Sequence, residues 1–512
     1  MAKTNRKLAL ISVADKTGVV ELARGLADLG WAVVSTGGTA TVLHEAGLKA
    51  VEVAEVTGHP EILDGRVKTL HPVIAGGILA RDDHLDELLE HGIKPIGLVC
   101  CNLYPFEEAV AAGKSESEII EEIDIGGVTL LRAAAKNHEE VVVLCDPGQY
   151  ENALERLASA EDTAGWRAEL ALAAFQRTAA YDAAISAHFR KLAEPNVVLP
   201  DSYVLSLNKA LEPVYGENPH QKGAFYVPGT DREMPLEQLN GPKPSYNNIY
   251  DLDGAMACAA EFVERPVAVI VKHGSPCGAA VADTLADAFT RAWQADPMSA
   301  YGGIVAFNRP VDVAAAEAAM VKGTFFHCVA APEYEDGVVE YLSTAKKWCE
   351  KFRIFKGLYP AARVELKSAL GGFIAQERDA GDLVAGWEVV TEREPAEEER
   401  ADLLFAYAVV KHVRSNAIVV AKDGVTLGIG GGSVNRLWPT LAALKRAGDA
   451  VKGSVLASDG FFPMSDGPDE ACKAGITAII QPGGSKRDED AIKVANEYGV
   501  AMVFAGRRHF KH

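Results

Sequence analysis

The stretch LALISVADKTGVVELARGLADLGWAVVSTGGTA (residues 8–40) decides the fold class of the amino-terminal part of the chain. Its first six residues, LALISV, form an apolar run of strand length. The segment from Asp15 to Leu29 then carries apolar side chains at helical spacing, and Gly30 ends the helix. WAVVS begins a second strand, which opens into TGGTA and another short helix. Strands and helices that alternate at this pitch predict a mostly parallel sheet covered on both faces.

The same alternation continues along the chain. Further strands are predicted at 96–104 and 141–145, and residues 150–193 are predicted to be almost wholly helical. EPNVVLP (194–200), with its two prolines, is typical of a linker, so a domain boundary is expected near residue 198. From residue 260 onward, apolar runs again alternate with helical stretches, and no internal repeat is visible. We therefore expect an α/β protein with domains at 1–198 and 199–512.

Composition limits the classes of partner. A chain of 512 residues with 48% hydrophobic content has room for two to four domains. Its formal charge of −20 argues against nucleic acid or an anionic membrane as a partner, because both would be repelled. No apolar run approaches the roughly 20 residues that cross a bilayer, and the amino terminus lacks a signal peptide's apolar region. We expect a cytoplasmic protein whose eight scattered cysteines are buried thiols.

Three amino-terminal motifs carry polar chemistry. STGGTA (35–40) lies between a strand and a helix, where free backbone N–H groups can hold a phosphate; the alternative is a tight turn capped by Thr39. DGRVKTLHP (64–72) gathers cationic and hydroxyl side chains, unless it is simply a solvated charged loop. IDIGGVTLLRAAAKNH (123–138) places Arg132 and Lys136 on one helical face after paired glycines, and two such cations are usually solvated. NLYPF adds Tyr104 at a strand end.

In the carboxy-terminal part, VAVIVKHGSPCGAA (267–280) is a predicted buried strand that ends on Lys272 and His273. A histidine with a pKa of about 6.5 suits proton transfer at cellular pH, and a lysine suits stabilisation of an oxyanion. Adjacent residues of a regular strand point to opposite faces, so the pair can serve one site only if the strand has ended, as Gly274 and Pro276 indicate. The alternative is a structural histidine beside a solvated lysine.

The same segment raises the question of zinc, because Cys277 follows Pro276. Zinc deaminases use a PCxxC motif, whereas here the cysteine is followed by Gly-Ala-Ala and the second cysteine is missing. We therefore expect no metal ligands here, and we expect Cys277 to be a small packing residue.

Several long motifs occur together: RVKTLHP, NLYPF, IDIGGVTLLRAAAKNH, YGENPHQ (215–221), VKHGSPCGAA, SNAI and SDGFFP. In this order they resemble the bifunctional purine-biosynthesis family that combines phosphoribosylaminoimidazolecarboxamide (AICAR) formyltransferase with IMP cyclohydrolase. The resemblance spans nearly the whole chain. It implies a methylglyoxal-synthase-like amino-terminal domain followed by two cytidine-deaminase-like α/β subdomains. It also implies a homodimer whose transferase sites draw residues from both subunits, 10-formyltetrahydrofolate as co-substrate, and a structural monovalent cation.

The first implied reaction closes the purine ring of formylated AICAR (FAICAR) to give IMP. An amide nitrogen joins a neighbouring formamide carbon and water leaves, so the site must polarise a carbonyl and move protons. The resemblance gives this chemistry to Lys68, Tyr104, Asp124 and Lys136, and leaves open which is acid and which is base. It gives binding of the nucleotide, chiefly its phosphate and ribose, to Ser12, Lys16, Ser35, Gly37, Gly38, Thr39, Arg66 and Thr69.

The second implied reaction transfers a formyl group from the folate to the poorly nucleophilic amine of AICAR. The resemblance makes Lys272, His273 and Asn416 catalytic, with Asn416 bonding the carboxamide or the transferring formyl group. Arg436 and Arg508 are candidates for anionic groups. The full set expected to line the nucleotide or folate pockets is Tyr215, Gly216, His220, Asn248, Tyr301, Gly302, Arg436, Phe462 and Arg508.

Two residues depart from the family's pattern. Val214 precedes the YGENPHQ segment, where the family usually has an arginine that helps hold the nucleotide phosphate. His327 stands about where the family has an acidic residue facing the substrate. Unless another cation such as Lys346 or Lys347 compensates, the transferase is altered.

Three hypotheses follow from these residues. The chain is the bifunctional enzyme, or a cyclohydrolase with a weakened transferase domain, or a non-catalytic nucleotide-sensing protein. Lys68, Tyr104, Lys272 and His273 together argue against the third hypothesis, because sensing does not require them.

Overall fold

The computed structural model describes residues 6–63, 65–159, 161, 163–229 and 233–512. The chain forms two compact units, of which the first extends to Asn208 and the second begins at Lys209. A short segment that begins at Pro228 also belongs to the first unit. The units therefore divide a few residues beyond the expected boundary near residue 198, and the assignment of one reaction to each domain stays a prediction.

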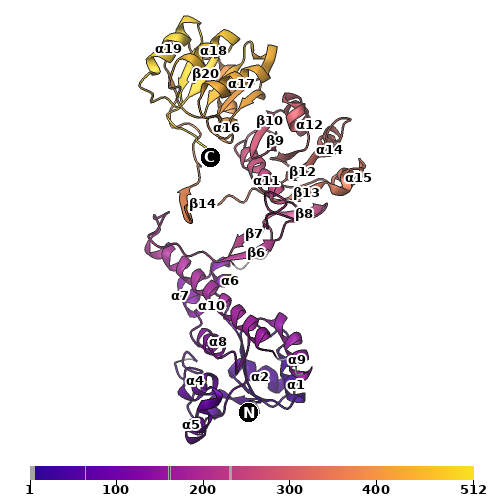
Figure 1. The fold of residues 1–512 in the computed structure, drawn as a ribbon, viewed down its shortest axis with the longest axis vertical. Coiled ribbons are helices and arrows are strands. Elements are labelled where there is room, and N and C mark those ends of the chain that lie inside the picture. The colour runs from indigo at the N-terminus through magenta and orange to yellow at the C-terminus, as the bar shows by residue number, and fades with distance from the viewer. Residues whose placement is uncertain (1–5, 64, 160, 162, 230–232) are drawn as a thin grey trace. The chain divides into compact units, whose positions relative to one another are not determined.

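The first unit is built on five parallel strands in the order β3–β2–β1–β4–β5 (Figure 1). The central strand is LALISV, whose residues pair with β2 on one side and β4 on the other. This confirms the α/β class and the parallel sheet expected from the opening stretch. The strands are β1 (Leu8–Val13), β2 (Ala32–Ser35), β3 (Val51–Glu52), β4 (Leu98–Asn102) and β5 (Val142–Leu144).

Helices connect and cover these strands. The segment predicted as one helical stretch at 150–193 is two helices, of which the first ends at Ser159 and the second begins at Ala164. The second of these, α10, packs on α8 and β5, and α8 packs on β4. The helices are α1 (Val19–Asp28), α2 (Gly37–Glu45), α3 (Val53–Thr57), α4 (Pro72–Leu79), α5 (Leu85–Glu90), α6 (Phe106–Ala111), α7 (Glu116–Glu121), α8 (Gly126–Lys136), α9 (Tyr150–Ser159) and α10 (Ala164–Ala193), with 3-10 turns at Asp82–His84 and Pro147–Gln149.

The second unit contains a twelve-stranded mixed sheet made of two halves with the same strand order. In each half a β-hairpin is followed by three strands that run parallel to one another. The first of the three pairs antiparallel with the first strand of the hairpin. An antiparallel bridge between β10 and β18 joins the halves. The first half has β8 (Glu237–Asn240), β9 (Val267–Lys272), β10 (Ser275–Val281), β11 (Gly303–Phe307), β12 (Phe326–Ala331) and β13 (Arg353–Lys356). The second has β16 (Glu388–Val389), β17 (Ile418–Lys422), β18 (Val425–Gly430), β19 (Val455–Ser458), β20 (Ala478–Gln481) and β21 (Ala501–Phe504).

This structural repeat agrees with the two α/β subdomains that the family resemblance implies, although no repeat is visible in the residues themselves. The halves share topology and not residues, so sequence inspection does not reveal the relationship. One helix precedes the hairpin in each half, α11 in the first and α16 in the second, and a further helix follows it, α12 and α17. Figure 1 shows the halves as pink and yellow parts of the ribbon.

Burial on both faces explains the unbroken apolar run of β9. Val269 packs in the core with residues of α11 and α16, whereas its neighbour Ile270 packs in a second core with residues of α12. A strand buried on both sides has no polar face, so polar alternation is lost. The helices are α11 (Tyr246–Ala259), α12 (Leu285–Ala295), α13 (Pro297–Ala300), α14 (Val313–Ala319), α15 (Val338–Thr344), α16 (Glu397–Val410), α17 (Leu437–Ala447), α18 (Asp466–Ala474) and α19 (Asp488–Glu497), with 3-10 turns at Cys349–Lys351 and Gly448–Val451.

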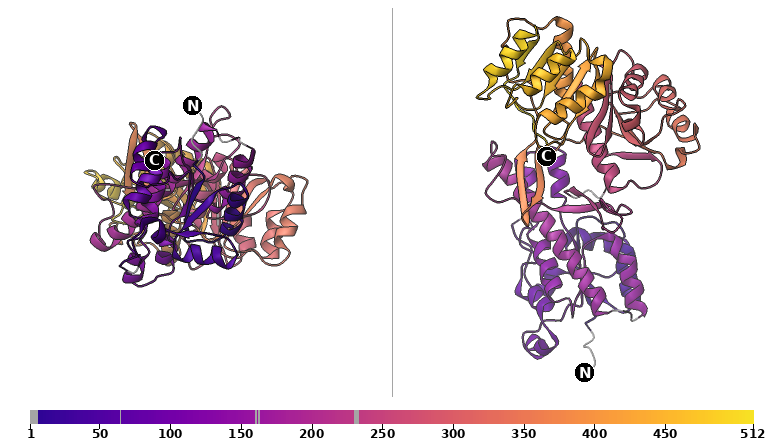
Figure 2. Two further views of the ribbon diagram at one scale, coloured as in Figure 1. Left: turned by 90° about the horizontal axis from the view of Figure 1, so that it is seen from below. Right: turned by 45° about the horizontal axis from the view of Figure 1, so that its top comes forward.

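Two small hairpins complete the structure. Strands β6 (Leu207–Leu211) and β7 (Phe225–Pro228) pair where the chain passes between the units. Strands β14 (Val364–Ala369) and β15 (Gly372–Glu377) form an antiparallel hairpin that stands away from the twelve-stranded sheet (orange in Figures 1 and 2). In the described part of the chain, no helix has the length and apolar character needed to cross a membrane.

Candidate active sites

The first candidate site lies at one edge of the five-stranded sheet. Because its strands are parallel, the loops after β1, β2 and β4 lie at the same edge. The Ser12 hydroxyl lies 3.0 Å from that of Thr36, and the Thr39 hydroxyl bonds the backbone of Val13. The Asn102 amide oxygen accepts from the backbone N–H of Asp15 at 2.9 Å, which holds the loop carrying Lys16. The sheet thus gathers Ser12, Lys16, Ser35 and the glycine loop, and sequence reasoning missed Asn102.

The glycine loop forms the amino terminus of α2. The N-cap residue is Thr36, whose side chain makes no capping hydrogen bond, whereas Thr39 lies inside the helix. The alternative that Thr39 caps this turn therefore does not hold. The Nζ of Lys68 lies 3.3 Å from the position that a Cβ on Gly37 would take, and a Cβ on Gly38 would meet no atom within 4 Å. An uncapped helix amino terminus with an adjacent lysine is suited to bind a phosphate.

The loop that carries Lys68 contains an acidic partner. Lys68 pairs with Glu61 at 3.0 Å, and the exposed Arg66 pairs with Glu121. Burial lowers the pKa of Lys16, and the nearby positive charge of Lys68 also lowers it. Asp64, in the same loop, lies outside the described residues. Glu61 was not singled out from the sequence, because a single glutamate carries no spacing signal.

Tyr104 and Asp124 lie together beside the start of α8. The Asp124 carboxylate accepts from the backbone N–H of Gly127 at 2.6 Å, and the backbone N–H of Asp124 donates to the Tyr181 hydroxyl at 2.9 Å. Burial raises the pKa of Asp124. Burial and the charge of Asp124 raise the pKa of Tyr104, so this phenol stays protonated and can donate. Thr69 joins the group, since its hydroxyl lies 2.8 Å from the Cβ position of Gly126.

Lys136 lies further along the helix that begins beside this group. It ends α8, ten residues beyond Gly126, which the helical rise converts to about 15 Å. Arg132 and Lys136 are both exposed, as expected for two cations on one helical face, and Arg132 stacks on Phe175. The sequence motif is contiguous, but the helix separates its two ends.

The second candidate site is the turn of the β9–β10 hairpin. His273 and Gly274 are its two central residues, with φ angles of 56° and 74°. The Asp251 carboxylate, from α11, accepts from both of their backbone N–H groups, at 3.1 and 2.6 Å. The strand ends at Lys272, as expected from the neighbouring glycine, although Pro276 lies within β10 and not in the bend.

The second half repeats this turn with different residues. Asp423 and Gly424 have φ angles of 53° and 68°, and Asp402 accepts from both of their backbone N–H groups, at 2.8 and 2.7 Å. Asp-Gly is a favoured pair for such a turn, because both central residues need positive φ. His273 occupies the position of Asp423, and both have a positive φ that residues other than glycine rarely adopt. Strained residues of this kind concentrate at functional sites.

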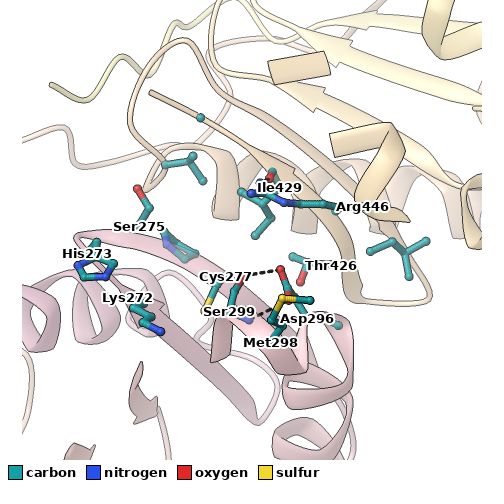
Figure 3. Close-up of a pocket in the computed structure, with 16 residues that line it drawn as sticks. Lys272, His273, Ser275, Cys277, Asp296, Met298, Ser299, Thr426, Ile429 and Arg446 are labelled. Carbon is teal, nitrogen blue, oxygen red and sulfur yellow. Dashed lines mark hydrogen bonds between the residues drawn. The ribbon is translucent and has the colours of Figure 1, made fainter. Parts of the chain in front are cut away.

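A cavity of about 440 Å³ opens beside this turn, between the two halves (Figure 3). Lys272 and His273 lie at one end, and Arg446 extends from the other half. Its walls include Met298 and Ile429, together with Ser275, Pro276, Cys277, Ala295, Asp296, Ser299, Val413, Thr426, Leu427, Gly428 and Gly431. The Lys272 ammonium donates to the backbone carbonyl of Tyr301 at 2.8 Å, so it lies between the turn and the segment carrying Tyr301 and Gly302.

Cys277 and the metal question can be described together. Burial raises the pKa of the Cys277 thiol to about 12, and its sulfur donates to the backbone carbonyl of Ile270 at 3.4 Å. It packs against the core of the first half. Within the described ranges, no group of three or more His, Cys, Asp or Glu side chains could hold a metal ion.

The remaining transferase residues are placed as follows. Asn248 lies in the first turn of α11, where its amide oxygen accepts a hydrogen bond from the backbone N–H of the N-cap residue Ser245. The YGENPHQ segment, with Tyr215, Gly216 and His220, is tied to α11 by a bond from Asn247 to the Glu217 carbonyl at 3.2 Å. Val214 is 80% exposed and offers no charge. Among the described residues, none of this segment lines the cavity.

His327 lies close to the Lys272 end of the cavity. Its Nε2 is 3.7 Å from the Cβ position of Gly302, and its ring is 5.0 Å from that of Phe325, which contacts Tyr301. Burial and the charges of Arg353 and Lys272 lower its pKa, so this side chain is mostly neutral at cellular pH. It therefore places an uncharged ring at the position where the resemblance led us to expect an acidic group.

Two expectations in the second half need correction. Phe462 is 1% exposed and belongs to the core, so its side chain cannot line a ligand pocket, whereas its neighbour Phe461 is exposed. Arg436 is 5% exposed and pairs with Asp459, which is fully buried, so it is not a free anion-binding group. Arg508 stacks on Phe510 at 4.3 Å, and Arg436 lies 5.9 Å from the same ring.

Comparison with known proteins identifies the family. The AICARFT/IMPCHase bienzyme pattern matches residues 134–446, and the MGS-like domain pattern matches residues 18–129. The chain belongs to the AICARFT/IMPCHase bienzyme family. The "Bifunctional purine biosynthesis protein PurH" of Oceanobacillus iheyensis is 48% identical over 99% of this chain and 100% of its own length. The protein of the same description from Deinococcus deserti is 47% identical over the same shares of both chains.

A solved structure is also similar in sequence over part of the chain. The protein described as "Crystal structure of ForH" is 39% identical to this chain, over 36% of this chain and 99% of that one, with a TM-score of 0.32. The two family patterns confirm the expected methylglyoxal-synthase-like amino-terminal domain and the family.

Proposed function

We propose that this bifunctional AICAR formyltransferase and IMP cyclohydrolase performs its two reactions at separate sites, one in each unit. Ring closure takes place at the edge of the five-stranded sheet, and formyl transfer takes place at the Lys272–His273 turn. The observation that carries the second assignment is the turn itself. A histidine occupies a position whose counterpart in the other half is an ordinary aspartate, and it borders a cavity. The function of a histidine at this position is proton transfer.

For ring closure, the phosphate of FAICAR binds at the amino terminus of α2, with Lys16 and Lys68 beside it. The amide nitrogen attacks the formyl carbon, a C–N bond forms, and the formyl oxygen leaves as water after receiving protons. Tyr104 donates a hydrogen bond to that oxygen, because its raised pKa keeps the phenol protonated. Asp124 accepts the proton of the attacking nitrogen, and the bond from Gly127 holds its carboxylate in place.

For formyl transfer, the amine of AICAR attacks the formyl carbon of 10-formyltetrahydrofolate. His273 accepts the proton of the amine, and Lys272 stabilises the tetrahedral oxyanion. Collapse of this intermediate breaks the bond to N10 of the folate, which takes up a proton. Tetrahydrofolate and FAICAR are the products.

The cavity fits a folate in chemical character. Met298, Ile429 and Val413 offer apolar walls for the pteridine and benzoyl rings, and Arg446 is available for the glutamate carboxylates. The Arg446 guanidinium bonds the backbone carbonyl of Ile429, and no ion pair to it is found in the described part of the chain. A folate bound with its formyl group at Lys272 would therefore have Arg446 as the cationic partner of its glutamate carboxylates.

The assembly that we propose is a homodimer in the cytoplasm, with transferase sites at the subunit interface. The β14–β15 hairpin supports it, because Phe373 and Ile374 are 75% and 61% exposed on a strand without a third partner in the described sheet. A second copy that covers these side chains would remove them from water. Light scattering should show a dimer, and F373S/I374S should give a monomer with impaired transfer and intact ring closure.

A structural monovalent cation is also part of the proposal. Asp459 and Ser415 supply neighbouring oxygens, but Arg436 already pairs with this carboxylate, so these residues do not by themselves show a fit.

The deciding experiment uses the purified full chain. AICAR with 10-formyltetrahydrofolate should give IMP, and FAICAR alone should also give IMP. Ring closure without folate consumption would instead support the cyclohydrolase with a weakened transferase, a candidate that the exposed Val214 favours. If neither reaction occurs, both assignments fail.

A further inference from the structure

The ion pair between Glu61 and Lys68 closes the neck of a loop in the first unit. Ile62 and Val67 pair in an isolated antiparallel bridge, with backbone hydrogen bonds of 3.3 and 3.4 Å. The bridge brings the flanking residues Glu61 and Lys68 side by side, although six residues separate them in the chain. The Glu61 carboxylate lies 3.0 Å from the Lys68 ammonium. The backbone of the loop therefore places these two charges together.

The same pair lies at the amino terminus of α2. The Lys68 Nζ and a Glu61 carboxylate oxygen are 3.3 and 3.8 Å from the position that a Cβ on Gly37 would take. The side chain of the N-cap residue, Thr36, makes no capping hydrogen bond. A negative charge near the first turn of a helix is stabilised by the helix dipole. Glu61 therefore places an anion of the protein itself where we propose that the phosphate of FAICAR binds.

The carboxylate and the phosphate compete for one lysine. A phosphate monoester carries nearly two negative charges and three acceptor oxygens, whereas a carboxylate carries one charge. The phosphate is therefore the stronger ligand of Lys68 and of the helix amino terminus. Two anions at this short distance repel one another, so the carboxylate must move away when the phosphate binds. The side chain of Glu61 is 35% exposed, so water is available to solvate it.

We propose that Glu61 is a competing anion, which pairs with Lys68 in the empty site and releases that lysine to the phosphate of the nucleotide. This inference rests on the proposed ring-closure site. Binding of FAICAR or IMP then requires the Glu61–Lys68 pair to break, which lowers the affinity for both nucleotides. The same requirement favours release of IMP, because the pair forms again when the product leaves. A ligand without a phosphate leaves the pair intact.

The first test is Glu61→Gln, which keeps the size of the side chain but removes its charge. The Kd of the full chain for IMP, measured by calorimetry, should fall roughly twofold to fivefold, because a partly exposed ion pair no longer has to be broken. The Kd for inosine, which has no phosphate, should not change. The kcat/KM of ring closure should rise by the same factor as the affinity for IMP, since FAICAR and its transition state carry the same phosphate.

Glu122→Gln is the matched control. Glu122 pairs with Lys114 at 3.0 Å, the same distance as in the Glu61 pair. The charges of both glutamates raise the pKa of Tyr104, so each variant removes one negative charge that acts on the ring-closure site. Only E61Q should bind IMP more tightly. An equal gain in E122Q would show an effect of net charge alone and would overturn the proposal.

Two other results would contradict the role of Glu61. A lower kcat/KM in E61Q with an unchanged Kd for IMP would show that Glu61 orients Lys68 for the reaction and does not compete with the phosphate. Equal tightening of IMP and inosine would mean that Glu61 acts on the base or the ribose.

Glu61→Ser is a second variant without the charge, and it should give the same gain in affinity for IMP if E61Q does not fold. Ring closure with no gain in either variant would refute this inference alone. If the unmodified chain neither binds IMP nor closes the ring, the proposed site fails together with the inference.

Discussion

Asp251→Ala tests whether the strained turn serves the transferase. The substitution removes two hydrogen bonds from a carboxylate to the N–H groups of His273 and Gly274, at 3.1 and 2.6 Å. At about 1.5 kcal/mol for each bond to a charged group, the free energy of unfolding of the second unit should fall by roughly 3 kcal/mol. A relaxed turn displaces His273, and a displacement near 1 Å costs roughly 100-fold in rate.

The repeat supplies a matched control for this prediction. Asp402→Ala removes the equivalent two bonds, at 2.8 and 2.7 Å, from a turn that does not line the cavity. Both variants should therefore lose similar stability in urea unfolding, but only D251A should lose transferase kcat. Equal transferase losses in the two variants, or an unchanged kcat in D251A, would refute the idea that the turn is strained for catalysis. Ring closure, measured with FAICAR, should be unaffected in both.

Four other outcomes are expected. His273→Ala should abolish formyl transfer and spare ring closure, and loss of both activities would contradict the division into two sites. Tyr104→Phe should slow ring closure by roughly 100-fold, because a hydrogen-bond donor to the oxyanion is lost. Since the pKa of Tyr104 is raised, the phenol stays protonated as the pH rises to 10, and a rate limb at lower alkaline pH that disappears in Y104F would be inconsistent with its role as donor. Arg446→Gln should raise the KM for 10-formyltetrahydrofolate but not for 10-formyltetrahydropteroate, which lacks the glutamate, and Lys445→Gln should change neither. Lys136→Ala should leave the kcat of ring closure nearly intact, and a loss as large as that of Y104F would show that Lys136 reaches the site.

The stability of the first site depends on pH through Asp124. Burial raises the folded-state pKa of this carboxyl above its unfolded value of 3.8, so folding favours the protonated form. Its contribution is therefore most favourable below the unfolded pKa and is lost as the pH rises through the folded pKa. The charged form that ring closure needs is thus formed against a stability cost.

Local patterns in the sequence predicted much of the fold. The run LALISV is β1 at the residues expected, because a short apolar segment that is followed by a helical stretch and a second apolar run is typical of a strand in an α/β protein. Lys272 was expected at a strand end and is there, because the adjacent glycine permits the positive φ of the turn. Long motifs also identified the family, which the comparisons confirm.

Contacts between distant segments could not be predicted in the same way. Glu61 beside Lys68 and Asp251 beneath His273 depend on how loops and helices pack, and neither carries a sequence signal of its own. Arg436 looked like an anion-binding residue because a charge in sequence carries no information about burial. Phe461 and Phe462 are chemically identical, and only packing decides which ring enters the core.

The sequence by itself determined the class of fold, the family and the residue types at both sites, since these depend on periodicity and on residues adjacent in the chain. Only the tertiary structure decided which of those residues meet. It placed Lys136 at the end of a helix and buried Arg436 behind Asn416. The physical reason is that the chemistry of a polar side chain depends on its partners and its exposure to water, and packing sets both.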